Sequence, residues 1–209
     1  MPAEPARADI APAWQPLPLP GAQVGIARTW LAAAQADALF AAVETALTWS
    51  QHAVSLFGRR LPAPRLSCWI GDAGADYRYS GTRHAPHPWP DALVELRRCI
   101  ERACGAPFNS VLANRYRHGQ DSMGWHADDE PELGAEPVIA SLSLGGERTM
   151  RFRSREGGTR FGVALGHGDL LVMRGATQRT YQHAVPKSRA ACMPRINLTF
   201  RQIVPPPQR

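Results

Sequence analysis

The chain has 209 residues, of which 44% are hydrophobic and 20% are charged, with a formal net charge of +6 and four cysteines. This is the composition of an ordinary globular domain, and no apolar run is long enough to cross a bilayer, so one domain without membrane contact is expected. The cysteines form no CxxC pair, which argues against a zinc finger or a disulfide-stapled scaffold and favours reduced thiols in a cytoplasmic protein.

The excess of positive charge comes mostly from arginine, whose planar group of several donors suits phosphate contacts. Nucleic-acid binding is one explanation of this charge. The other is a general compositional bias toward arginine and alanine, which needs no anionic partner. The charge alone leaves both explanations open.

A short lead-in is expected to precede the domain. Residues 1–20 are rich in proline and alanine and lack the basic start and apolar stretch of a secretory signal, so a disordered segment is expected there. Residues 21–205 then form a single domain. Its helices are expected within residues 21–108 and its jelly-roll core within residues 109–205.

Two amphipathic helices are predicted in the first part of the domain. The first covers Trp30–Leu47, where apolar residues recur at helical spacing after a short strand at Val24–Ala27. The second covers Asp91–Cys104 and is opened by a Pro-Asp pair, which is favoured at helix starts. Between the helices, Arg65–Ile70 and Asp76–Ser80 are expected to be strands separated by a glycine-containing turn.

The segment Ser55–Arg60 interrupts this pattern and predicts a hairpin tip. Leu56 and Phe57 lead through Gly58 into a pair of cations that begins with Arg59. In one interpretation the tip is a buried corner with a solvated basic edge, and the residues alone favour this one. In the other, an apolar wedge flanked by phosphate-binding cations intrudes into a base stack.

From residue 109 onward, short strands separated by tight glycine turns are predicted. They are expected at Val111–Tyr116, Trp125–Asp128, Pro137–Leu144, Thr149–Arg153, Gly168–Met173, Gln182–Val185 and Arg195–Arg201. Helices followed by roughly eight strands predict a mostly β protein of the α+β class, a jelly-roll of two packed sheets with buttressing helices.

His126 and Asp128 are the first candidate metal ligands. On a strand, residues two apart point to the same face, so this imidazole and carboxylate can be aimed at one point. They would be two of the three protein ligands of a 2-His-1-carboxylate Fe(II) site, although a His-x-Asp pair alone often occurs by chance. Only His167 and His183 follow. His167 lies in a glycine turn that is typical of the surface, so His183, on a predicted strand, is preferred as the third ligand.

The last predicted strand carries a possible anion site. Arg195, Asn197, Thr199 and Arg201 share one face by alternation. Two arginines on an inward face are costly unless they are paired with anions. This face is therefore either the solvated surface of an edge strand or a clamp in which an arginine binds a carboxylate bidentately.

Asn114 and Tyr116 alternate in the same way on another predicted strand and can add neutral donors. An Fe(II) site with an arginine clamp is what a 2-oxoglutarate-dependent oxygenase needs. The co-substrate chelates iron through its keto-acid end, its far carboxylate pairs with an arginine, and O2 is consumed.

These residues together resemble the AlkB family of Fe(II)/2-oxoglutarate dioxygenases. The similarity extends roughly from Ser55 to Phe200 and follows the family order in Asn114-x-Tyr116, Trp125-His126-x-Asp128-Asp129-Glu130, Ile139–Gly145, Gly168–Met173, His183 and Arg195-x-Asn197-x-Thr199-Phe200-Arg201. It implies a double-stranded β-helix (jelly-roll) core.

The resemblance also implies a role for each matching residue. His126, Asp128 and His183 are the implied iron ligands. Arg195 is the implied partner of the 2-oxoglutarate carboxylate distal to the iron, and the residues implied to complete that site are Asn114, Tyr116, Asn197 and Arg201.

Within the family, the sequence looks most like the branch that repairs alkylated duplex DNA. Phe57-Gly58-Arg59, preceded by Leu56, stands where that branch has its base-displacing hairpin tip. Gly71–Gly74 followed by Tyr77–Gly81 matches its substrate lid, although Ile70 and Arg78 depart from the usual residues.

By the same resemblance, five residues are implied to contact the substrate. Tyr79 and His126 would sandwich the flipped base, and Glu130 would lie near its exocyclic nitrogen. Tyr77 and Arg65 complete the implied substrate site.

The expected function is oxidative demethylation of 1-methyladenine- and 3-methylcytosine-type bases in DNA, by base flipping and methyl hydroxylation with release of formaldehyde, succinate and CO2. The alternatives are the same chemistry on RNA, on a protein or on a small molecule, and a catalytically inactive jelly-roll that binds nucleic acid. The complete set of ligand and clamp residues argues against the inactive version. A cytoplasmic monomer that acts on duplex or single-stranded DNA is expected.

Overall fold

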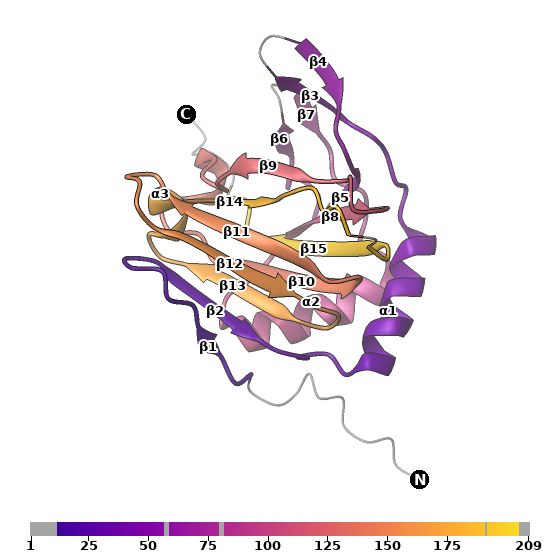
Figure 1. The fold of residues 1–209 in the computed structure, drawn as a ribbon. Helices are drawn as coiled ribbons and strands as arrows, with labels where there is room; N and C mark the ends of the chain where they lie inside the picture. Colours follow the sequence, from indigo (N-terminus) through magenta and orange to yellow (C-terminus); the bar gives the residue numbers. More distant parts are fainter. Residues whose placement is uncertain (1–11, 57–58, 80–81, 191, 205–209) are drawn as a thin grey trace.

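The structure is a computed structural model that describes residues 12–56, 59–79, 82–190 and 192–204. In residues 54–56, 59–60, 77–79 and 82–84 it describes the backbone alone. Two β-sheets face each other, and two helices cover the outer face of the larger sheet (Figure 1). This is the jelly-roll with buttressing helices that the order of elements predicted.

The larger sheet is antiparallel and has seven strands in the order β1-β2-β13-β10-β15-β8-β5. β15 lies inside the sheet between β10 and β8, and all of its residues are buried, so the edge-strand interpretation is wrong. The strands are β1 (Gln15–Pro16), β2 (Gln23–Ala27), β13 (Leu170–Arg174), β10 (Ile139–Gly145), β15 (Arg195–Arg201), β8 (Ser110–Tyr116) and β5 (Leu66–Gly71).

The smaller sheet has the order β12-β11-β14-β9, formed by β12 (Arg160–Leu165), β11 (Arg148–Ser154), β14 (Tyr181–Val185) and β9 (Met123–His126). Two further hairpins lie at one end of the molecule, beyond β9 (Figure 1). They pair β3 (Ala53–Leu56) with β4 (Arg59–Pro62) and β6 (Tyr77–Tyr79) with β7 (Thr82–His84).

Alternation along the strands divides the interior into two layers. On β15, Ile196, Leu198 and Phe200 belong to the core shared with α1 (Ala33–Ala46) and α2 (Asp91–Cys104). The other face of the larger sheet meets the smaller sheet around a second apolar cluster that includes Ile139, Met150, Phe152, Leu171 and Met173. The polar residues of β15 therefore point between the two sheets.

Both predicted helices are present. α1 is shorter than predicted, whereas α2 has the predicted bounds and ends at Gly105, whose φ of 59° is the left-handed conformation that glycine adopts easily at helix ends. Short helices in the described part of the chain are η2 (Pro131–Leu133) and α3 (Thr177–Thr180). Among the described residues, no helix is long and apolar enough to span a membrane.

The N-terminal boundary of the fold lies earlier than expected. β1 pairs with β2, Leu19 is only 4% exposed, and the Leu17 backbone N–H donates to the Val24 carbonyl at 2.8 Å. Residues 12–20 therefore belong to the fold, because their few apolar side chains pack on the sheet despite the proline-rich composition. Residues 1–11 of the predicted lead-in lie outside the described residues.

Candidate metal and co-substrate site

The three predicted metal ligands converge in the structure. His126, the last residue of β9, is the direct cross-strand partner of His183 on β14, and their ring centroids are 4.2 Å apart. The candidate ligand atoms of His126, Asp128 and His183 all lie within 4.8 Å of one another. Over the described part of the chain, this is the one such cluster of His, Cys, Asp and Glu side chains. His167 lies elsewhere and accepts a hydrogen bond from the Gly145 backbone N–H.

Asp128 reaches the cluster by a different route from the predicted one. β9 ends at His126, so strand alternation does not extend to Asp128. Instead, the Asp128 backbone N–H donates to Gln178 Oε1 at 3.0 Å, and Asp128 Oδ1 accepts from Arg201 Nη2 at 2.7 Å. Gln178 was missed by the sequence reasoning, because nothing in its local pattern distinguishes it from a surface glutamine.

The surroundings of the candidate ligands favour hydrogen bonding and protonation that suit metal binding. His126 Nδ1 lies 2.9 Å from the Gly124 carbonyl oxygen, which can only accept, so Nδ1 is the donor there and Nε2 is the nitrogen left for a metal ion. Burial, with the nearby His126, lowers the pKa of His183 to about 3 and keeps it neutral. Burial opposes the ionisation of Asp128, but the charge of Arg201 and its hydrogen bond to the carboxylate lower the pKa of Asp128 to about 2.

One carboxylate oxygen shows that the cluster fits a cation. Asp128 Oδ2 is buried, has no hydrogen-bond partner among the described residues, and lies 3.8 Å from His183 Nε2. A buried anionic oxygen without a partner is costly unless a cation binds it. Two imidazoles and one carboxylate are the donor set of a non-haem Fe(II) site. The residues present therefore fit this metal.

Arg195 provides the corresponding fit for a carboxylate. Its side chain is buried between the sheets, and its Nη2 donates to Ser143 Oγ at 2.9 Å and to Asn197 Oδ1 at 2.7 Å. Nε and Nη1 have no hydrogen-bond partner within the described chain. Burial lowers the pKa of Arg195 to about 10, although the adjacent Tyr116 opposes the shift, so the group stays charged at neutral pH. A charged fork with two unused nitrogens suits a carboxylate.

All the predicted ligand and clamp residues line one pocket, called the ligand pocket below: Asn114, Tyr116, His126, Asp128, His183, Arg195, Asn197 and Arg201. Ser141 and Thr199 line it too. Ser141 Oγ donates to Asn197 Oδ1 at 3.1 Å, and Asn197 Nδ2 donates to Thr199 Oγ1 at 2.7 Å, which fixes the amide. Alternation had placed Thr199 on this face, and the same reasoning along β10 could have found Ser141.

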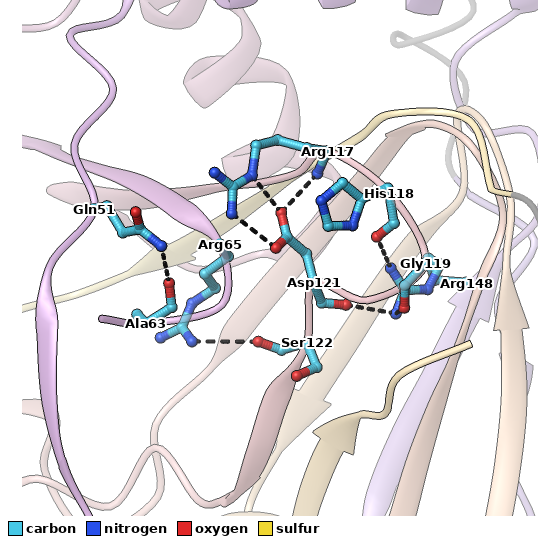
Figure 2. A network of polar contacts seen from close by, with 9 residues as sticks. All are labelled: Gln51, Ala63, Arg65, Arg117, His118, Gly119, Asp121, Ser122 and Arg148. Carbon is cyan, nitrogen blue, oxygen red and sulfur yellow. Dashed lines mark hydrogen bonds and ion pairs between the residues drawn. The ribbon is translucent and has the colours of Figure 1, made fainter. Parts of the chain in front are cut away.

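Apart from His126, two predicted substrate residues can be located, and neither lines the ligand pocket. Arg65 Nε donates to Asn114 Oδ1 at 2.9 Å, and its Nη1 donates to the Ser122 carbonyl at 3.4 Å (Figure 2). Arg65 therefore braces Asn114, which lines the ligand pocket. Glu130 is partly buried and immediately precedes η2. Substrate contact by either residue stays a prediction.

The remaining substrate and wedge residues lie in the two projecting hairpins. Tyr77 and Tyr79 are on β6, and Leu56 and Arg59 are paired positions on β3 and β4, with only the backbone described in each case. The two central wedge residues, Phe57 and Gly58, lie outside the described residues. These roles also stay predictions.

The outer face of the smaller sheet carries a basic hollow of about 240 Å³, lined by Trp125, Arg151, Phe152, Arg160, Phe161 and Gly162. Trp125 is 39% exposed, and the Arg153 guanidinium lies 4.5 Å from its ring centroid. Arg153 and Arg160 are direct cross-strand partners. Because like charges placed opposite each other destabilise a sheet, an anion bound here would relieve the repulsion.

Comparisons with known proteins agree with this geometry. The family model described as the 2OG-Fe(II) oxygenase superfamily matches residues 23–201. The chain is 40% identical over 184 residues to "Alpha-ketoglutarate-dependent dioxygenase alkB homolog 3" of Bos taurus, covering 83% of this chain and 64% of that protein. It is 37% identical over 183 residues to "DNA oxidative demethylase ALKBH2" of Mus musculus, covering 82% of this chain and 77% of that protein.

The chain spans little more than half the length of some relatives. The match to the human alkB homolog 3 is 45% identical over 155 residues and covers 69% of this chain but 54% of that protein. Among solved structures, "The structure of OsALKBH1" matches with a TM-score of 0.66 and 18% identity, covering 90% of this chain and 99% of that one. That likeness supports the fold.

Proposed function

The chain belongs to the AlkB family of the 2OG-Fe(II) oxygenase superfamily, and on this premise we propose that it is an oxidative demethylase of alkylated bases in nucleic acid. One observation carries the proposal: the cluster of His126, Asp128 and His183 shares a pocket with the buried Arg195. Fe(II), 2-oxoglutarate and O2, when bound, supply the oxidising chemistry that hydroxylates a methyl group.

The chain's own residues bind and orient these reactants. His183 presents a neutral nitrogen and Asp128 an ionised oxygen, so neither has to lose a proton before metal binds. Arg201 holds the Asp128 carboxylate, and Gln178 holds the Asp128 backbone through its N–H. Arg195 would hold the far carboxylate of 2-oxoglutarate, and such fixed geometry lowers the entropic part of the barrier.

Two features support nucleic acid as the substrate class. The mouse relative bears the name of a DNA oxidative demethylase. The basic hollow is lined by Arg151, Arg160 and the 39% exposed Trp125 ring, a combination that suits phosphates and bases. With a net charge of +6, the protein would also attract a polyanion from a distance.

The finer proposal is the repair of 1-methyladenine- and 3-methylcytosine-type lesions in DNA. A methyl group on the Watson–Crick edge is inaccessible in a duplex, so the base must be flipped out, and a base that cannot pair costs least to flip. Tyr79 and His126 would stack on the flipped base, and Phe57 would fill the gap left behind. Loss of formaldehyde from the hydroxylated methyl restores the base.

The test is turnover of three methylated substrates: duplex DNA, single-stranded DNA and RNA, each compared with its unmethylated form, with Fe(II) and 2-oxoglutarate present. Succinate and formaldehyde are expected in equal amounts from the methylated DNA. Turnover confined to RNA would move the substrate from DNA to RNA. Binding of all three without any succinate would instead identify a non-catalytic module.

Substitution of one ligand tests the site itself. His183→Ala should reduce iron-dependent turnover to less than about one hundredth. Even the loss of a residue that only supports a metal ligand lowers metal affinity or activity by about 10- to 100-fold. The matched control is His87→Ala, which removes an exposed histidine outside the ligand pocket. Circular dichroism should show that both variants fold. Full activity in the His183 variant would overturn the ligand assignment.

A further inference from the structure

Arg148 is a buried cation outside the residues assigned to the site so far. It is the first residue of β11, is 4% exposed, and forms no ion pair within the described chain. Its guanidinium is satisfied by backbone carbonyl oxygens instead. Nη2 donates to the backbone carbonyl oxygens of Asp121 at 2.8 Å and Pro186 at 2.7 Å. Longer contacts reach the carbonyl oxygens of His118 and Gly119. A buried charge without a counter-ion is costly, so its placement needs a physical reason.

The segment that Arg148 holds joins two walls of the ligand pocket, because it connects Tyr116 at the end of β8 to β9, which carries His126. Figure 2 shows Asp121 of this segment held on two sides. Its carboxylate accepts from the Arg117 backbone N–H at 2.9 Å and from the Arg117 guanidinium at 2.8 and 2.9 Å, while its carbonyl accepts from Arg148.

Arg148 also contacts the co-substrate wall directly. Its Cζ lies 5.5 Å from the centroid of the Tyr116 ring, and the Cζ of Arg195 lies 5.3 Å from the same centroid. A guanidinium over an aromatic ring is held by cation–π attraction, so both arginines restrain one ring. In the described residues neither arginine has a carboxylate partner, and they repel each other. An anion bound at Arg195 would relieve this repulsion.

We propose that Arg148 is a positioning residue for 2-oxoglutarate. It fixes the Tyr116 ring and residues 118–121, and it adds positive potential at the distal carboxylate without touching the ligand. This inference rests on the proposed function, since it assumes that the ligand pocket binds 2-oxoglutarate. Arg148 acts through Tyr116 and Arg195, so its effect should appear in co-substrate affinity more than in the maximal rate.

The test is the dissociation constant of 2-oxoglutarate, measured by calorimetry with Mn(II) in place of Fe(II), for the wild type, Arg148→Met and Arg117→Met. Arg117 is the matched control because it holds the same Asp121 from the other side, through the carboxylate. Arg148→Met should weaken binding by about tenfold, the scale of a desolvated cation–π contact. Arg117→Met should change it by less than about twofold, because the Arg117 side chain does not line the ligand pocket.

A second variant guards against misfolding. Arg148→Lys keeps the charge but cannot span the same set of carbonyls, and it should weaken binding by about threefold, between the wild type and Arg148→Met. In turnover, the KM for 2-oxoglutarate should rise in the Arg148 variants while kcat stays within about twofold, as expected for lost ground-state binding.

The outcomes separate the two proposals. If the wild type binds 2-oxoglutarate and both Arg148 variants bind it with the same dissociation constant, the inference about Arg148 is overturned and the proposed function stands. Equal weakening by Arg148→Met and Arg117→Met would also overturn it, because loosening of residues 118–121 would then explain the effect without the Tyr116 ring or the charge of Arg148. Absence of 2-oxoglutarate binding by the wild type would overturn the proposed function, and the inference with it.

Discussion

At the scale of single residues, the ligand pocket holds more positive than negative charge. Asp128 is the one carboxylate among its lining residues, whereas Arg195 and Arg201 are both cationic there. Arg201 is paired with Asp128 at 2.7 Å, which leaves the charge of Arg195 uncompensated. Since 2-oxoglutarate is a dianion, this imbalance favours its binding beside a metal cation.

Asp121 provides a prediction about pH. Burial disfavours its ionised form, but the hydrogen bonds and charge of Arg117 prevail and lower the pKa of Asp121 from its ordinary value of 3.8. Such a group stabilises the fold above its ordinary pKa and loses this contribution as the pH falls through the lowered one. Asp121→Asn should therefore cost about 1–3 kcal/mol at pH 7, as for a buried charged hydrogen bond.

Urea unfolding of the wild type and Asp121→Asn between pH 7 and pH 2 measures this difference. It should shrink once the pH falls below 4, because protonation then removes the same charge from the wild type. A difference that stays constant down to pH 2 would show that the ionised Asp121 carboxylate contributes nothing.

At the scale of elements, the turn between β10 and β11 sets where Arg148 enters the interior. Gly145 in this turn has a φ of 81°, which a residue with a side chain adopts only with strain. A Cβ there would press on the Pro194 carbonyl oxygen and lie 2.8 Å from the Phe40 ring of α1. The glycine therefore permits both the turn and the close approach of α1.

Gly145→Ala should destabilise the fold by about 3 kcal/mol, the sum of left-handed strain and overpacking. Gly157→Ala is the matched control, because Gly157 has a similar φ of 88° and a Cβ added there would have no atom within 4 Å. It should cost about 1 kcal/mol, from strain alone. Chemical denaturation measures both, and equal losses would contradict the steric argument.

The β3–β4 hairpin carries a second prediction at this scale. Leu56 pairs with Arg59 across it, and Phe57, which lies outside the described residues, is the predicted wedge. Phe57→Ala should lower kcat/KM on methylated duplex DNA by about tenfold and on single strands by less than about twofold, because only a duplex leaves a gap to fill. An equal loss on both substrates would return Phe57 to a structural role.

At the scale of the whole molecule, one strand links the two sites. Trp125 and His126 are neighbours on β9, so their side chains point to opposite faces of the smaller sheet. His126 lines the ligand pocket between the sheets, and Trp125 lines the basic hollow outside. A nucleic-acid strand held at the hollow would thus lie one sheet away from the metal ligands.

The salt dependence of nucleic-acid binding tests this arrangement. The combined change Arg151→Ala and Arg160→Ala should reduce the slope of log K against log salt by about two, one for each lost phosphate contact. The control is Arg98→Ala with Arg102→Ala, which removes two exposed arginines from α2. Fluorescence anisotropy gives the slopes, and an unchanged slope in the first variant would exclude the hollow from phosphate binding.

The sequence predicted those strands and helices in which the spacing of apolar residues shows which face is buried. The alternation in Arg195–Arg201 and the helical spacing in Asp91–Cys104 predicted β15 and α2 with their observed bounds. Strand β12 was missed, because Gly162 and exposed residues such as Arg160 interrupt its alternation. The jelly-roll class, the three ligands and the arginine clamp followed from spacing together with the family resemblance.

The tertiary structure decided how those parts meet. Asp128 is held by residues 50 and 73 positions away, β15 is an interior strand, and Arg148 reaches four carbonyls on two segments. The spacing of residues along one strand or helix does not predict these contacts, because they depend on which strands are neighbours and in what register they pair. The sequence by itself determined which side chains could serve the site, and the packing of the two sheets determined which of them meet there.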